Sequence, residues 1–198
     1  MLSSKLIWLK RFCARFGVIA IMFAGCWQIG SAGYIQGKAH LAQFLLNLAW
    51  SQTLQGETKV KPWGWADTYP VARLTFNKQQ DDYIVLAGGT GRTMAFGPGH
   101  VSSTPLPGNG SNSVMVGHRD THFSGLKYLK LGDEIHVETT KQKMRYKVVD
   151  AFIVDHKQSE VMGDFGVDLL TLITCYPFDA LHAGGPLRYV VQAEPTPY

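Results

Sequence analysis

Charged side chains are scarce in this sequence. They make up 17% of its residues, whereas soluble domains carry roughly 25%, and a lipid-embedded segment would dilute charge in this way. The formal net charge is only +4, and the first fifteen positions hold four of the nineteen basic residues: Lys5, Lys10, Arg11 and Arg15. Much of the basicity therefore belongs to the terminus, and no nucleic-acid partner is predicted.

Cysteine is rare as well, with three residues in 198. Cys13 lies at the edge of an apolar N-terminal segment, and Cys26 lies inside it, where a thiol behaves as a small apolar group. Cys175 is then the only cysteine of the remaining chain and has no disulfide partner within it. In an oxidising compartment such a thiol is a candidate reactive group, although a buried structural thiol is an equal alternative on this observation alone.

The usual cofactor motifs are absent. Gly88-Gly89-Thr90-Gly91 lacks both the Gly-Lys-Ser/Thr ending and the strand-to-helix setting of a phosphate-binding loop, so we interpret it as a turn. Glu160, Asp164 and Asp168 do not form the alternating ligand pattern of a calcium loop. The spacing of histidines and cysteines matches no zinc motif. We therefore predict no metal site and no cofactor.

A long uncharged segment near the N-terminus predicts a membrane anchor. Residues 16–35 form twenty positions without a formal charge, and a helix of that length matches a hydrocarbon core about 30 Å thick. The alternative is a cleaved signal peptide, for which Ser31-Ala32-Gly33 is a weak cleavage site. Because the basic residues precede the segment, the positive-inside rule places the N-terminus in the cytoplasm and residues beyond about 36 outside it.

The chain is long enough for one well-cored domain with a small appendage, and too short for two ordinary enzyme domains. We predict a basic tail and anchor in residues 1–36, a juxtamembrane helix and linker in 37–61, and the main domain in 62–198. The juxtamembrane helix should end near Gly56 and either pack on the domain or lie at the lipid surface. Its apolar residues at helical spacing are Leu41, Phe44, Leu45, Leu48 and Leu54.

Short β-type segments dominate the main domain. Gly, Pro, Asn and Asp separate them without the strand–helix–strand rhythm of a parallel sheet, which favours a closed or nearly closed all-β barrel. The predicted strands are Val71–Phe76, Tyr83–Leu86, Ser113–Gly117, Glu134–Thr139, Met144–Phe152, Leu169–Thr174 and Tyr189–Gln192.

Cys175 directly follows one of these strands. Pro177 cannot donate to a sheet ladder and restricts Tyr176, so we expect strand pairing to stop there. The exit of a strand suits a nucleophile, because a rigid element fixes the sulfur and the following loop leaves room for a substrate. The reactive form of cysteine is the thiolate, so Cys175 would need a cationic or basic neighbour.

Two such neighbours occur at other strand ends. His118 follows the predicted strand that ends at Gly117, a residue that would permit close backbone approach. Arg188 precedes the strand that begins at Tyr189, where burial without a partner would be costly, so we expect it to face a groove. Taken singly, a structural histidine or a surface arginine is the more ordinary interpretation. A barrel could, however, bring these strand ends to one rim.

The motifs around these residues resemble those of sortases, a family of cysteine transpeptidases. Thr171–Cys175 is similar to the family's TLxTC signature, and Arg188 stands thirteen positions later, where sortases carry an arginine. The resemblance is strongest to the sortases of Gram-negative proteobacteria and covers roughly residues 62 to 193. The other segments that carry it are Pro62–Asp67, Phe96–His100, Leu106–Gly108, Val116–Phe123 and Cys175–Asp179.

The resemblance implies a closed eight-stranded β-barrel and a thiol endopeptidase that recognises an LPxTG-like signal near the C-terminus of a secreted protein. Such an enzyme cleaves after the Thr of the signal and forms a thioacyl-enzyme, which an amine then resolves. A peptidoglycan peptide and water are both open as acceptors. The implied location is the inner membrane, in contact with lipid, with the catalytic domain in the periplasm.

The resemblance also implies roles for individual residues. Cys175 attacks, His118 acts as general acid and base, and Arg188 donates hydrogen bonds to the oxyanion or the substrate backbone. Thr174 is a second-tier candidate, although strand alternation points its side chain away from that of Cys175. The other second-tier candidates for the site or its rim are His100, Asp120 and His122.

Two other classes of protein fit less well. A papain-like protease places its cysteine early and its histidine far downstream, which is the reverse of the order found here. A non-catalytic, membrane-tethered barrel that binds peptides would not need a solitary cysteine with histidine and arginine at matching strand ends. Substrate processing that survives Cys175→Ala would favour that second class.

Overall fold

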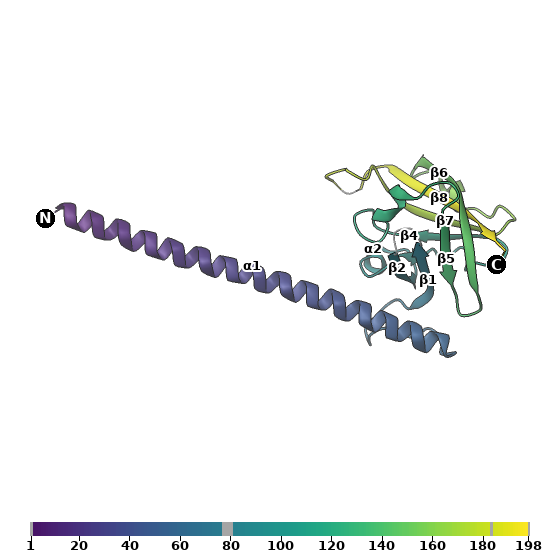
Figure 1. Cartoon of the computed structure of the whole chain (residues 1–198), viewed down its shortest axis with the longest axis horizontal. Helices are drawn as coiled ribbons and strands as arrows, with labels where there is room; N and C mark the ends of the chain where they lie inside the picture. The colour runs from purple at the N-terminus through teal and green to yellow at the C-terminus, as the bar shows by residue number, and fades with distance from the viewer. Residues whose placement is uncertain (1, 77–80, 183, 198) are drawn as a thin grey trace. The chain divides into compact units, whose positions relative to one another are not determined.

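The computed structural model describes residues 2–76, 81–182 and 184–197. It divides into two compact units, Met1–Ala42 and Gln43–Tyr198. Helix α1, Leu2–Leu54, is continuous, so the predicted anchor and the predicted juxtamembrane helix are parts of one helix (Figure 1). The helix ends beside Gly56, as predicted, where a φ of 102° suits a glycine at a helix C-terminus.

The first unit has the properties of a membrane-spanning helix. Its large apolar side chains are exposed, among them those of Phe23, Trp27 and Ile29. The helix from Arg15 onward contains a segment that is long and apolar enough to cross a membrane. Exposed apolar side chains on all sides of a helix are stable in lipid and unfavourable in water. The N-terminal helix could therefore span a membrane, in agreement with the prediction from its uncharged segment.

The second unit is a closed β-barrel. Over the described residues, eight strands follow the order β1-β2-β3-β4-β7-β8-β6-β5, which confirms the predicted fold (Figure 1). The strands are β1 Pro70–Phe76, β2 Asp81–Ala87, β3 Gly99–His100, β4 Asn112–Val116, β5 Glu134–Glu138, β6 Lys143–Asp155, β7 Leu169–Tyr176 and β8 Leu187–Thr196. The short helices between them are α2 Gly91–Met94, η1 Ser124–Tyr128 and η2 Ser159–Met162.

The main hydrophobic core fills the inside of the barrel. Successive side chains of a strand point to opposite faces, so Leu170 and Leu172 of β7 point inward and pack with Val191 of β8. All three are fully buried. A smaller apolar cluster on the opposite face joins Ile173 of β7 and Val190 of β8. Both faces of the β7–β8 pair therefore hold these strands in place.

The last turns of α1 pack on the outside of the barrel. Leu46 and Trp50 form a buried cluster with Ile84 and Leu86 of β2. Burying side chains of this size stabilises a fold by about 1.5–3 kcal/mol each. Residues 43–54 therefore belong to the barrel domain as much as its strands do.

The packed face of α1 is not the one that the spacing suggested. Phe44 and Leu48 are 65% and 46% exposed, whereas Leu46 and Trp50 are 0% and 2% exposed. Both pairs are four residues apart, so both satisfy helical periodicity. The contact with β2 determines which pair is buried, and the local sequence does not reveal this contact.

Several strand limits also differ from the prediction. β7 continues past its predicted end at Thr174 to Tyr176, because Tyr176 still pairs with Leu187. The segment Gly88–Gly91, predicted to be a turn, leads directly into α2, where Thr90 Oγ1 accepts a hydrogen bond from the Thr93 amide at 3.2 Å. β3 and α2 are too short to leave a periodic pattern, and the sequence did not predict them.

Candidate active site

Cys175 lies near the end of β7, on the outer face of the barrel. Leu172 points into the core, so Ile173 and Cys175, one and three residues further on, point to the other face. The thiol is free and half-buried. A partly exposed thiol on a rigid strand is accessible to a peptide and fixed in position.

The sheet places Arg188 directly beside Cys175. The two residues are partners in the antiparallel pairing of β7 with β8. Opposite residues in such a pair have side chains on the same face, with Cβ atoms about 4.5–5.5 Å apart. Nη1 of Arg188 donates to the carbonyls of Gly185 at 2.7 Å and Leu187 at 2.8 Å. Its Nε and Nη2 make no hydrogen bond to any residue that the structure describes.

His118 is brought to the other side of Cys175 by a parallel pairing. β4 runs parallel to β7, with Val116 opposite Ile173, and the Gly117 amide donates to the Ile173 carbonyl at 3.2 Å. β4 ends at Val116, so His118 follows it by two residues, beside the end of β7 that carries Cys175. The His118 ring is exposed and makes no hydrogen bond within the described part of the chain.

The barrel therefore gathers Arg188, Cys175 and His118 along one rim, on β8, on β7 and just beyond β4. A family model, "Sortase domain", matches residues 74–196, more than half of the chain. The chain belongs to the sortase family.

Known sortases agree in sequence and in fold. Sortase D of Bacillus subtilis (strain 168) is 30% identical over 96 residues, 48% of this chain and 48% of that protein. Sortase A of Bacillus anthracis is 28% identical over 109 residues, 53% of this chain and 51% of that protein. The crystal structure of sortase C-1 from Actinomyces oris is 31% identical, with a TM-score of 0.59, and the match covers 65% of this chain and 76% of that one. The chain thus spans about half the length of the curated relatives that it matches.

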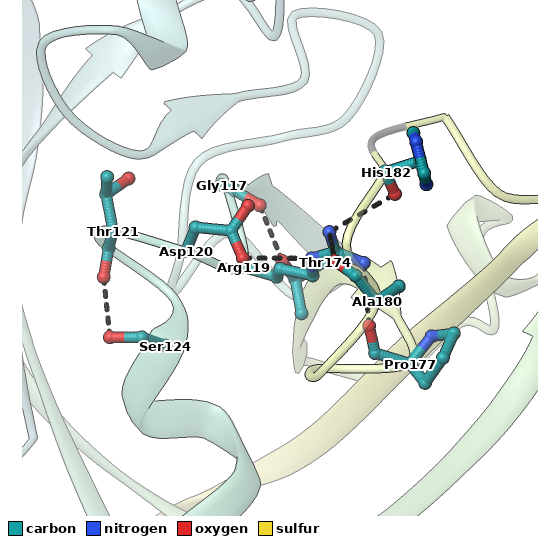
Figure 2. Close-up of polar contacts among 9 residues, drawn as sticks. All are labelled: Gly117, Arg119, Asp120, Thr121, Ser124, Thr174, Pro177, Ala180 and His182. Atoms are coloured by element: carbon teal, nitrogen blue, oxygen red, sulfur yellow. Dashed lines mark hydrogen bonds and ion pairs between the residues drawn. The ribbon is translucent and has the colours of Figure 1, made fainter.

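Thr174 supports the rim of this sortase from inside the barrel. Its buried hydroxyl donates to the Gly117 carbonyl at 2.7 Å, as Figure 2 shows. The side chain thus points away from Cys175, in agreement with strand alternation. The hydrogen bond joins the residue before Cys175 to the residue before His118, and so links the two strand ends that carry the site.

Gly117 leaves room for the ring of Phe123 beside His118. A Cβ atom at this position would lie only 2.8 Å from Cγ of Phe123, which is fully buried. The Phe123 amide also donates to the His118 carbonyl at 3.0 Å. The predicted close approach at Gly117 is therefore present, and it fixes the backbone of His118 against the core.

His122 is the second-tier candidate that lies within electrostatic reach of His118. It is half-buried, and its ring meets that of Tyr83 edge-on, with the ring centroids 5.6 Å apart. Burial lowers the pKa of His122, and the charge of His118 lowers it further. The two rings are therefore close enough for the charge of His118 to act on His122.

His100 and Asp120 have contacts of other kinds. His100 is buried in β3, with Nε2 3.0 Å from the Pro105 carbonyl and 3.3 Å from Oγ1 of Thr104, so it holds the loop after β3. Burial lowers the pKa of His100, against a smaller opposing effect of the Pro105 hydrogen bond. Asp120 is exposed, and its Oδ1 lies 3.0 Å from Nε of Arg119.

Arg119 is a candidate that the sequence did not single out. Its side chain is buried and donates to carbonyls of the loop between β7 and β8. The available signal was its place directly after His118 in the segment that resembles the GHR motif of sortases. An arginine in a polar turn ordinarily faces solvent, and its long-range partners are visible only in the fold.

Proposed function

We propose that the protein is a sortase-type cysteine transpeptidase with Cys175 as its nucleophile. The observation that carries the proposal is that Arg188 lies opposite Cys175 in the pairing of β7 with β8, while β4, which leads to His118, pairs with β7 on its other side. The Cys175 thiolate attacks the carbonyl carbon of a peptide bond and forms a tetrahedral intermediate. Its collapse breaks the C–N bond and leaves a thioacyl-enzyme and a free amine.

His118 moves the protons in this scheme. As an imidazolium it protonates the leaving amine, and as a neutral imidazole it accepts a proton from the incoming amine. Its exposed ring is accessible to both groups. Because the reaction needs a deprotonated nucleophile and a protonated general acid, the pH–rate profile should have two limbs.

Arg188 stabilises the negative charge on the substrate oxygen. Its Nη1 donates to the carbonyls of Gly185 and Leu187, which directs the guanidinium, and its other donors make no hydrogen bond to a described residue. A guanidinium stays charged across the whole working pH range. A preorganised donor aimed at an oxyanion accelerates such reactions by about 10²–10³-fold.

The proposed substrate is a secreted protein with an LPxTG-like signal near its C-terminus, cleaved after the Thr. The motifs shared with sortases support this substrate class. An amine, for which a peptidoglycan peptide is the candidate, resolves the thioacyl-enzyme by transpeptidation, and water resolves it by hydrolysis. The resemblance to proteobacterial sortases and the apolar helix α1 support an inner-membrane enzyme in contact with lipid, with its N-terminus cytoplasmic and its barrel periplasmic.

The test uses the full chain in detergent micelles, because removal of residues 43–54 would expose Ile84 and Leu86 on β2. Wild-type protein and Cys175→Ala are incubated with an LPxTG peptide library, with and without added amines, and the products are identified by mass spectrometry. We expect cleavage after Thr and an amine-ligated product in the wild type only. Loss of the nucleophile should lower the rate by roughly a thousandfold or more.

The other outcomes are equally informative. Hydrolysis without ligation would indicate a sortase-like protease. Cleavage that persists in Cys175→Ala would exclude the cysteine mechanism. Binding of peptides without cleavage would favour a non-catalytic peptide-binding barrel.

A further inference from the structure

Arg119 makes a dense set of polar contacts at the rim. Its side chain is only 6% exposed. Nη1 donates to the Pro177 carbonyl at 2.7 Å, and Nη2 donates to the carbonyls of Ala180 at 2.7 Å and His182 at 3.4 Å (Figure 2). Nε donates to Oδ1 of Asp120 at 3.0 Å. A single guanidinium therefore binds three positions of one loop.

This loop connects the strand of the nucleophile to the strand of the arginine. It leaves β7 after Tyr176 and enters β8 at Leu187. At its far end the Gly185 carbonyl accepts a hydrogen bond from Nη1 of Arg188. The Arg188 guanidinium is therefore held by this loop together with the Leu187 carbonyl of β8.

Arg119 also acts on the other flank of the site. It follows His118 directly in the chain, so anchoring its side chain in the loop restrains the backbone that carries His118. Cys175 lies on β7, between the two strands that are coupled in this way. One guanidinium thus links the groups on both sides of the thiol.

The contacts explain why arginine is needed at this position. A buried charge is unfavourable unless it is paired and its N–H groups are satisfied. The Asp120 carboxylate pairs with the charge, and the loop carbonyls accept the other donors. A planar guanidinium reaches carbonyls spread over several residues, whereas the ammonium of lysine is a compact point charge. Charge-assisted hydrogen bonds are also about twice as strong as neutral ones.

We propose that Arg119 is a positioning residue for acylation of Cys175. By holding the loop after the nucleophile, it keeps the Arg188 guanidinium on one side of the thiol and the His118 ring on the other. Arg119 itself need not touch the substrate. The inference rests on the proposed cysteine mechanism, since it assigns Arg119 a role in that site alone.

The expected effect of Arg119→Lys is on the chemical step. A shift of about 1 Å in a reacting group can cost on the order of 10²-fold, so we expect the single-turnover rate constant for acylation to fall roughly 10- to 100-fold. KM should change by less than about threefold, because substrate contacts are preserved. A single-turnover rate constant does not depend on the fraction of folded enzyme. A merely structural role would therefore leave it unchanged.

The experiment follows thioacyl formation by mass spectrometry in the full chain, with a peptide that the wild type cleaves and Cys175→Ala does not. Arg119→Lys and Arg119→Gln are compared with the matched control Arg92→Ala. Arg92 is an exposed arginine whose Nη1 lies 3.2 Å from Oδ2 of Asp67. Each protein is assayed at a temperature well below the midpoint of its own thermal unfolding. The control should acylate at the wild-type rate.

Slower acylation in a folded Arg119 variant, with the control unchanged, supports the proposal. Acylation at the wild-type rate in a folded Arg119→Lys or Arg119→Gln protein overturns it. Variants that never fold would show that Arg119 supports the whole domain, and would overturn a specific role at the site. Equal cleavage by wild type and Cys175→Ala would contradict the proposed cysteine mechanism, and the inference about Arg119 would fail with it.

Discussion

The two faces of the β7–β8 pair perform different tasks. On the inner face, Leu172 and its cross-strand partner Val191 are fully buried in the core. On the outer face, three residues further along β7, Cys175 and its partner Arg188 are partly exposed. A single hydrogen-bonded ladder therefore packs one face into the core and carries the candidate catalytic groups on the other. Because successive side chains of a strand point to opposite faces, a substitution on the inner face should change stability and one on the outer face should change the reaction rate.

The largest expected effect in this comparison is a loss of stability from the inner face. Leu172→Ala removes a fully buried side chain and leaves a cavity, so the free energy of unfolding should fall by about 3 kcal/mol. Denaturant titration measures this, with Val149→Ala, at an exposed position of β6, as the control expected to change by less than about 0.5 kcal/mol. Acylation of the folded molecules should proceed at the wild-type rate. A slower chemical step in folded Leu172→Ala would show that the two faces are coupled.

On the outer face, Arg188→Lys should lower the reaction rate and leave stability nearly unchanged. The compact ammonium of lysine cannot span the carbonyls of Gly185 and Leu187 and a substrate oxygen as the planar guanidinium can, so kcat should fall by about 10²-fold. The free energy of unfolding should stay within about 0.5 kcal/mol, because the hydrogen bonds of the guanidinium to described residues are local, to the carbonyls of Gly185 and Leu187. Steady-state kinetics and denaturation on the same preparation test both expectations. Wild-type kcat in this variant would remove Arg188 from the proposed mechanism.

The sequence predicted the residues of the candidate site better than their arrangement. Cys175, His118 and Arg188 each stood at the end of a predicted strand, within motifs that resemble those of sortases. Their alignment depends on the parallel pairing of β4 with β7, and no local pattern encodes such a long-range pairing. Arg119 was missed for the same reason, since its carbonyl partners lie 58 to 63 residues away in the chain.

The fold shows a similar limit. A closed or nearly closed barrel and most of its strands were predicted from short apolar runs separated by turn residues, and the closed eight-stranded form was implied by the resemblance to sortases. The packed face of α1 did not, because Leu46 and Trp50 share their four-residue spacing with Phe44 and Leu48. Local periodicity identifies a helix but cannot choose between two apolar faces when the partner strand is distant in sequence.

The smallest expected effect is on the pH dependence of the free energy of unfolding. It distinguishes His100, a histidine of the scaffold, from His118 at the rim. Burial holds the pKa of His100 below its ordinary value of 6.5, so the folded protein binds this proton less readily than the unfolded chain does. As the pH falls below about 6.5, the unfolded chain is protonated first, and the free energy of unfolding decreases until the pH passes the folded-state pKa. The pKa of His122 is lowered in the same direction. His100→Gln should therefore reduce this acid destabilisation without abolishing it.

Denaturant titrations of the wild type and His100→Gln between about pH 7.5 and pH 5 measure the change, with the His100→Gln, His122→Gln double variant as the reference that removes both contributions. The acid limb of the kcat/KM profile should lie at the same pH in His100→Gln as in the wild type, because the proposed proton transfers belong to His118 at the rim. If that limb moved with His100, a residue packed against the loop after β3 would be taking part in the chemistry. The separation between a rigid scaffold and a reactive rim would then not hold at this edge of the barrel.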